Sequence, residues 1–151
     1  MGSRHRRVRP SGRRRMWTYA TCGMSQPGGD RMLELHMFGP RPAWELVEIL
    51  TVVAHFHRTG SALGIGHTVN LGRSWIDNSP CDHALVSLPY LDGPSLENLS
   101  LPDGSTVRCA WLIPITSAEV RYKKKHGLEA LEERFEAGGL DHLDPHRASV
   151  C

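Results

Sequence analysis

The chain lacks any apolar run that approaches the roughly 20 residues needed to span a bilayer. Its arginine-rich start is not followed by the apolar segment of a secretory signal. Position six is an arginine, whereas N-terminal myristoylation requires serine or threonine there. These absences predict a cytoplasmic protein that neither spans nor binds a membrane.

The sequence also lacks paired cysteines. Cys22, Cys81, Cys109 and Cys151 lie far apart, and none belongs to a CxxC pair. In a cytoplasmic protein, isolated cysteines of this kind are reduced thiols that mostly act as packing groups. We therefore expect no disulfide framework.

No common catalytic signature is complete. Ser25 lies in a Gly-Met-Ser-Gln-Pro segment, which departs from the G-x-S-x-G elbow because proline replaces the second glycine. The Gly64–Gly66 segment has neither the third glycine of a dinucleotide loop nor the lysine of a phosphate loop. We therefore predict that the chain is not an enzyme and needs no cofactor.

The nine histidines invite a metal hypothesis, but they lack the paired spacing of zinc motifs such as HExxH. His55 and His57 fall in a predicted helix, where side chains two residues apart point about 200° from each other. We favour packing or surface roles for the histidines. A metal-dependent hydrolase that uses His67, Cys81 and His83 is the alternative hypothesis.

Charge is divided unevenly along the chain. Residues 1–15 hold seven arginines and no acid, so residues 16–151 hold 11 basic against 16 acidic side chains. We predict that residues 1–15 form a disordered arm and that residues 16–151 form one domain. An acidic domain favours a basic protein partner over nucleic acid. A nucleic-acid binder that acts through the arginine-rich arm is a second alternative.

Periodic patterns alternate between strand and helix without strict βα repetition. Strands are predicted at Trp17–Cys22, Met32–Phe38, His67–Leu71, Asp82–Leu88 and Thr106–Ile115. Helices are predicted at Ala43–Arg58, Thr116–His126 and Leu128–Ala137. This order indicates the α+β class, a mixed α/β sandwich with a mostly antiparallel sheet and helices packed on it.

Three of these elements carry more specific signals. The last predicted strand is apolar on both faces, which is typical of a central strand covered by helices. Thr116 and Glu119 have the spacing of a capping box. The first helix has a predicted buried stripe of Leu46, Ile49, Leu50, Val53 and Phe56, which His57 continues.

Candidate partner-binding residues come from a loop and a helix face. Trp75 and Tyr90 lie in segments with few other apolar groups, and such aromatic side chains either plug the core or anchor a contact. We favour a plug for Trp75 and leave Tyr90 open. The last predicted helix presents an acidic face that we propose as a docking surface: Glu129, Glu132, Glu133 and Glu136.

Five short motifs, in this order, resemble the suppressor of fused-like domain family. They are Cys22-Gly23-Met24-Ser25, Met32–Phe38, Leu46–Leu50, Leu63–Val69 and the Trp111–Glu119 junction; the ending Leu143–Val150 also resembles the family's tail. Family members usually carry structured sequence before the Gly-Met-Ser segment. Here the arginine stretch occupies that place, so we expect an incomplete edge of the domain.

The resemblance implies a protein that binds other proteins. Animal members restrain a transcription factor with the help of an extra C-terminal domain, for which this chain has no room, so it resembles the compact bacterial type. That type is associated with immunity proteins that neutralise toxins. The leading hypothesis is therefore a bacterial immunity-type module that occludes a basic toxin. The sequence identifies neither the toxin nor the oligomeric state.

Overall fold

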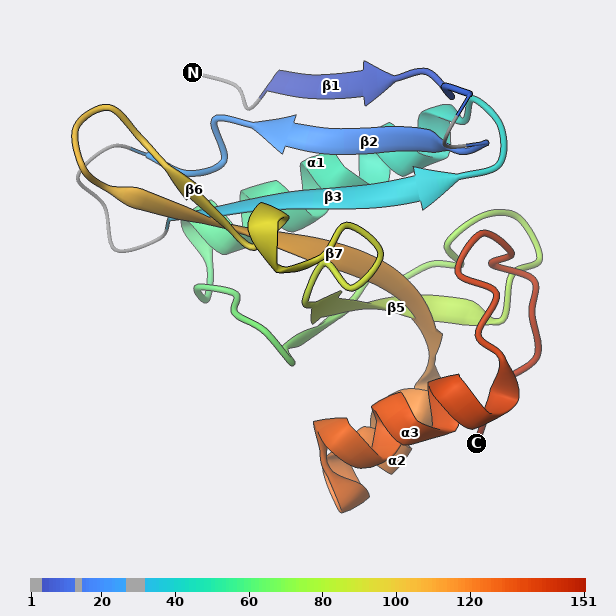
Figure 1. Ribbon diagram of the computed structural model, residues 1–151. Coiled ribbons are helices and arrows are strands. Elements are labelled where there is room, and N and C mark those ends of the chain that lie inside the picture. Colours follow the sequence, from blue (N-terminus) through green and yellow to red (C-terminus); the bar gives the residue numbers. More distant parts are fainter. Residues whose placement is uncertain (1–3, 13–14, 27–31) are drawn as a thin grey trace.

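A mixed sheet of seven strands, with helices on both faces, forms the centre of the computed structural model (Figure 1). The structure describes residues 4–12, 15–26 and 32–151. The strands follow the order β1-β2-β3-β7-β5-β4, and β6 pairs with β7 off this path. Among the described strands, only β3 and β7 run parallel, so the predicted α+β class with a mostly antiparallel sheet is confirmed.

Most predicted elements are present with small shifts of their ends. The strands are β1 (Arg4–Val8), β2 (Trp17–Cys22), β3 (Leu33–Gly39), β4 (Thr68–Asn70), β5 (Cys81–Ser87), β6 (Asn98–Ser100) and β7 (Thr106–Thr116). The helices are α1 (Trp44–Thr59), the short 3-10 helix η1 (Pro94–Leu96), α2 (Ser117–His126) and α3 (Leu128–Gly138). Sequence patterns missed β1, β6 and η1, which are short or polar.

β7 separates two hydrophobic cores. Ala110 and Leu112 point into the core beneath α1, whereas Trp111 and Ile113 point into the core beneath α2 and α3. Figure 1 shows α1 behind the sheet and the α2–α3 pair at its lower edge. The strand is apolar on both faces because each face is covered, which confirms its predicted central position.

α1 buries the expected residues with one exception. Leu46, Ile49, Leu50 and Val53 are buried, and so is His57, whose Nδ1 accepts a hydrogen bond from the Leu63 amide at 2.9 Å. The prediction for Phe56 is wrong, because this side chain is exposed. A helix turns by 100° per residue, which places Phe56 at the edge of the helix surface that faces the sheet. Its ring lies beside Gly60, at the C-terminal end of α1, instead of in the core.

The structure differs from the expectation of a disordered arm. Residues Arg4–Val8 form edge strand β1, antiparallel to β2. A polar segment can occupy an edge because backbone pairing requires no buried side chain. Two further contacts hold it: the Arg7 guanidinium lies 5.2 Å from the centre of the Trp17 ring, and His5 Nε2 lies 2.8 Å from Thr51 Oγ1. Residues 1–3 and 13–14 of the predicted arm lie outside the described residues.

A buried ion pair fixes the C-terminal segment that follows α3. Glu119, fully buried, closes the predicted capping box with Thr116. The same carboxylate accepts two hydrogen bonds from Arg147, at 2.6 Å and 2.9 Å. Arg147 also donates to the Pro114 carbonyl at 2.9 Å. Glu119 therefore caps the N-terminus of α2 and also fixes the segment that contains Arg147, 28 residues later in the chain.

Candidate functional site

The three candidate metal ligands lie in different environments. Cys81 is fully buried at the start of β5, and burial raises the pKa of its thiol to about 11. His83 Nδ1 lies 2.7 Å from Asp82 Oδ1, and exposed His67 accepts the Gly64 amide on its own Nδ1 at 3.2 Å. Within the part of the chain that the structure describes, no group of three or more His, Cys, Asp or Glu side chains is placed to hold a metal ion.

Two of the five partner-binding candidates, Tyr90 and Glu132, are in direct contact. Tyr90 is 58% exposed, on the loop between β5 and η1. Its hydroxyl donates a hydrogen bond to Glu132 Oε1 of α3 at 3.2 Å. Partial burial, followed by the charge of Glu132, raises the pKa of the Tyr90 hydroxyl. Tyr90 is thus an exposed aromatic side chain rather than a plug, whereas Trp75 is buried as predicted.

Several glutamates surround this tyrosine. Glu132 accepts the hydrogen bond from Tyr90 directly, and the charges of Glu136 and Glu97 also raise the pKa of the Tyr90 hydroxyl. Burial, and then repulsion from Glu129 and Glu136, raises the pKa of Glu132. Arg108 Nη2 lies 3.7 Å from Glu97 Oε1 and offsets part of the charge of that carboxylate. Glu129, Glu132 and Glu136 follow one another on α3 at helical spacing, so this part of the surface carries a negative potential.

Glu97 is a member that sequence reasoning missed. It lies between η1 and β6, seven residues beyond Tyr90, and its charge raises the pKa of the Tyr90 hydroxyl. The neighbouring side chains Leu91 and Leu96 are exposed and apolar. We call the set Tyr90, Leu91, Leu96, Glu97, Glu132 and Glu136 the Tyr90 surface. Glu129 and Glu133 are exposed on the same helix α3.

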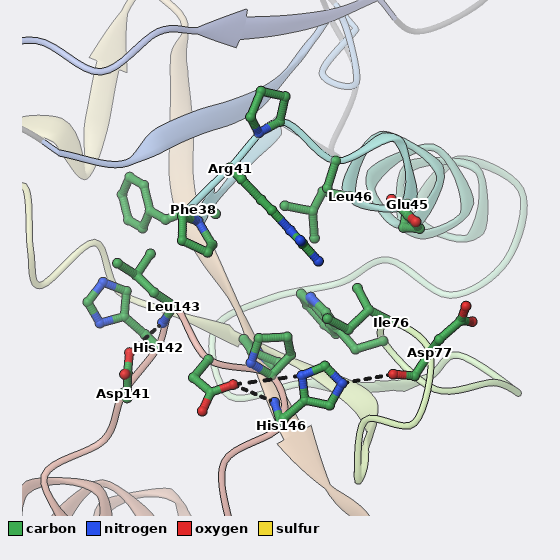
Figure 2. Close-up of a pocket in the computed structure, with 18 residues that line it drawn as sticks. Phe38, Arg41, Glu45, Leu46, Ile76, Asp77, Asp141, His142, Leu143 and His146 are labelled. Atoms are coloured by element: carbon green, nitrogen blue, oxygen red, sulfur yellow. Dashed lines mark hydrogen bonds and ion pairs between the residues drawn. The ribbon is translucent and has the colours of Figure 1, made fainter.

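A large cleft lies elsewhere, between the β3–α1 loop, the Trp75–Asp77 loop and the C-terminal segment (Figure 2). It has a volume of about 850 Å³. Figure 2 shows Arg41 reaching across it toward Ile76. His146 is fixed at its edge, because Nε2 lies 2.8 Å from the Asp77 carbonyl and Nδ1 lies 3.9 Å from Asp144. No nucleophile is paired with a base among the side chains that line this cleft.

A second, smaller groove of about 430 Å³ lies on the sheet beside β6. At its base the carboxylate of Glu34 accepts hydrogen bonds from the Thr21 hydroxyl at 2.5 Å, the Gly23 amide at 2.9 Å, and the Ser25 amide and hydroxyl at 3.0 Å and 2.7 Å. The side chain of Ser25 therefore shapes the turn. Because these four hydrogen bonds come from Thr21, Gly23 and Ser25, Glu34 holds the Cys-Gly-Met-Ser turn in place.

Comparison with known proteins decides the family. The sequence matches the family described as suppressor of fused protein (SUFU) over residues 5–148. The chain belongs to the SUFU family. No curated protein matches the sequence.

Solved structures agree with membership of the SUFU family. A SUFU homologue from Neisseria gonorrhoeae is 34% identical with a TM-score of 0.79, and the match covers 96% of this chain and 76% of that one. Drosophila Suppressor of Fused shares the fold at 16% identity, with a TM-score of 0.72. That match covers 98% of this chain but only 42% of the Drosophila chain.

A third structure shows the fold in a complex. A Sufu-Fu complex contains a chain that is 16% identical, with a TM-score of 0.70, and the match covers 98% of this chain and 76% of that one. In that relative the SUFU protein therefore binds a protein partner. In this chain, no helix within residues 4–12, 15–26 and 32–151 has the length and apolar character that crossing a membrane requires.

Proposed function

We propose that this SUFU-family chain is a non-enzymatic module that binds a basic protein partner through the Tyr90 surface. The observation that carries the proposal is that Tyr90, an exposed aromatic side chain, donates a hydrogen bond to Glu132 of α3, whose neighbours Glu129 and Glu136 on the same helix are also acidic. An aromatic face attracts a lysine or arginine cation, and nearby carboxylates supply charge-assisted hydrogen bonds to it. Exposed Leu91 and Leu96 add the apolar contact that a stable interface needs.

The biological role we propose is that of an immunity-type protein that occludes a toxin. Stoichiometric inhibition needs complementary shape and charge rather than a catalytic set. The chain as a whole carries a formal net charge of +2, with arginines on edge strand β1 and glutamates gathered on α3. The local acidic surface of α3, rather than the net charge, raises the rate of encounter with a basic toxin and makes the rate sensitive to salt. The binding of a partner in the Sufu-Fu complex supports the general class and not the toxin.

The test begins with capture of the partner at the proposed surface. A photo-crosslinking residue at position 91 should trap a discrete protein in the native cell, whereas the same residue at exposed position 121 on α2 should not. The product of the neighbouring reading frame is the first candidate for direct measurement. Equal crosslinking at the two positions would contradict the surface.

Binding of the captured protein is then measured against variants. Tyr90→Ala and Glu136→Gln should each weaken binding, by about tenfold or more for the tyrosine, because interface aromatics contribute most. Asp77→Asn, at an exposed carboxylate outside the Tyr90 surface and outside α3, is the matched control. Association should slow as salt rises. If the captured partner is not a toxin but its binding depends in the same way on these variants and on salt, the binding surface is supported and the immunity role is contradicted.

A further inference from the structure

The cleft of Figure 2 has the size of a small-molecule site, and the binding of a partner at the Tyr90 surface does not involve it. Its volume of about 850 Å³ lies within the range of about 300–1,000 Å³ that is usual for ligand pockets. Its walls are residues 38–46, 75–77 and 141–146, together with Pro114 of β7. A ligand loses little free energy on entering such a cleft if the walls are already in place.

The wall that carries Arg41 is held from behind by a buried tyrosine. The Tyr19 hydroxyl accepts a hydrogen bond from the Ala43 amide at 2.8 Å and donates one to the Arg41 carbonyl at 3.4 Å. Pro40 and Pro42 lie on either side of Arg41, and their rings fix φ at about −65°. Arg41, which Figure 2 shows directed across the cleft, thus extends from a backbone that is already fixed.

The other two walls are joined to each other. His146 Nε2 lies 2.8 Å from the Asp77 carbonyl oxygen, and the Ser79 hydroxyl donates a hydrogen bond to the Pro145 carbonyl. These contacts connect segments that are 69 and 66 residues apart in the chain. The opening between the three walls therefore belongs to the fold and needs no ligand to form it.

The cleft contains charges of both signs. Among the residues that the structure describes, none forms an ion pair with Arg41. Four carboxylates also line the cleft: Glu45, Asp77, Asp141 and Asp144. The last two each accept a backbone amide of their own turn, at 3.0 Å and 2.9 Å. An anion would be repelled by the carboxylates and a cation by the guanidinium, whereas a ligand that carries both charges complements both.

We propose that this cleft, which we call the Arg41 cleft, binds a free apolar dipeptide as a zwitterion. The guanidinium of Arg41 receives the terminal carboxylate, which its paired N–H groups match in geometry. The terminal ammonium faces the carboxylates of the lining. The apolar side chains of the dipeptide pack on Leu46, Ile76 and Leu143, which line the cleft together with four prolines. A dipeptide rather than a single amino acid suits a volume in the upper part of the usual range.

The Arg41 cleft has no residue in common with the Tyr90 surface. The dipeptide and the protein partner can therefore bind independently, and either proposal can fail without the other. The recognition of both peptide termini also predicts that blocking either one weakens binding.

Isothermal titration calorimetry of the full chain at about pH 6.5 tests the proposal, since the amino group of a peptide is protonated there. The probe is leucyl-leucine, with leucyl-leucinamide and N-acetyl-leucyl-leucine as analogues that each lack one charge. We expect leucyl-leucine to bind with a dissociation constant below about 1 mM, and each analogue to bind at least about tenfold more weakly. Glycyl-glycine keeps both charges without the apolar body and should also bind at least about tenfold more weakly.

A variant places the carboxylate at Arg41. Arg41→Gln should weaken the binding of leucyl-leucine about tenfold and should bind leucyl-leucinamide equally well, because the group that distinguishes acid from amide is gone. Arg121→Gln, at an exposed arginine of α2, is the matched control and should behave like the wild type. Circular dichroism melts verify that both variants are folded.

Three results overturn the proposal. The first is that leucyl-leucine shows no binding to the wild type up to about 10 mM. The second is that either blocked analogue binds as well as the free dipeptide. The third is that Arg41→Gln still prefers the acid to the amide, or that Arg121→Gln weakens binding as much as Arg41→Gln does.

Discussion

The Tyr90 hydroxyl and the Glu132 carboxylate lie 3.2 Å apart, although 42 residues separate them in the chain. This hydrogen bond ties an exposed loop to α3. It also leaves the carboxylate among neighbours of its own charge, Glu129 and Glu136. An arrangement that gathers repulsive charge around an exposed aromatic ring costs stability, and a basic partner would remove that cost.

Substitution Glu132→Gln should stabilise the free protein slightly and weaken partner binding. Burial and neighbouring charge raise the pKa of Glu132, so its ionised form disfavours the folded state at neutral pH. The gain in unfolding free energy should be at most about 0.5 kcal/mol, as for surface changes in general. Thermal melts at pH 7 measure it. At a pH below the pKa of the carboxyl the advantage should vanish, and Glu133→Gln should show none at either pH.

Arg147→Ala should destabilise the fold strongly. Its guanidinium makes two hydrogen bonds to Glu119, and removing it leaves that carboxylate buried and without its cation. Breaking one partner of a buried pair costs about 3–5 kcal/mol. Urea unfolding measures the loss. Arg73→Ala removes an exposed pair with Glu48 and should cost less than about 1 kcal/mol. Similar losses for the two variants would contradict the assigned role of Arg147.

The buried pair also predicts how stability depends on pH. Burial opposes the ionisation of Glu119, but hydrogen bonds from Arg147 and from backbone amides hold its pKa below the ordinary value. The stabilisation is therefore complete above the unfolded pKa, about 4.3, and is lost as pH falls through the folded pKa. Glu119→Gln should be less stable at pH 7 and should lose less stability between pH 5 and pH 3 than the wild type.

The cysteines should differ in reactivity with a thiol reagent. Burial raises the pKa of Cys81 to about 11, so at pH 8 little of it is thiolate, and its sulfur is also inaccessible. Cys22 and Cys151 are exposed and free. Ellman's reagent should modify these two in the folded protein and reach Cys81 only after unfolding. Peptide mapping identifies the sites, and early labelling of Cys81 would contradict its buried position.

Much of the fold could be predicted because local patterns and tertiary structure agree. β7 has apolar residues on both faces, which matches a position between two cores. The capping box at Thr116 and Glu119 marks the start of α2. The sequence pattern does not predict the ion pair between Glu119 and Arg147, because the two residues come together only in the folded chain.

The candidate site was predicted in pieces but not as a surface. Tyr90 and the glutamates of α3 were singled out separately, and their contact depends on how α3 packs under β7. Glu97 carried no signal because its neighbours in sequence are those of an ordinary turn. Phe56 fits the helical period and is nevertheless exposed, since periodicity does not say where the covered arc ends. β1 was missed because edge pairing leaves no hydrophobic pattern.

The position of β7 has a consequence for synthesis on the ribosome. It is the last described strand along the chain, yet it pairs with β3, β5 and β6. A nascent chain must therefore wait for residues 106–116 to emerge before the strands made earlier find their common neighbour. Until then the edges of β3 and β5 that pair with β7 in the folded protein are unpaired. Unpaired strand edges favour aggregation, so this interval is when the growing chain is most prone to aggregate.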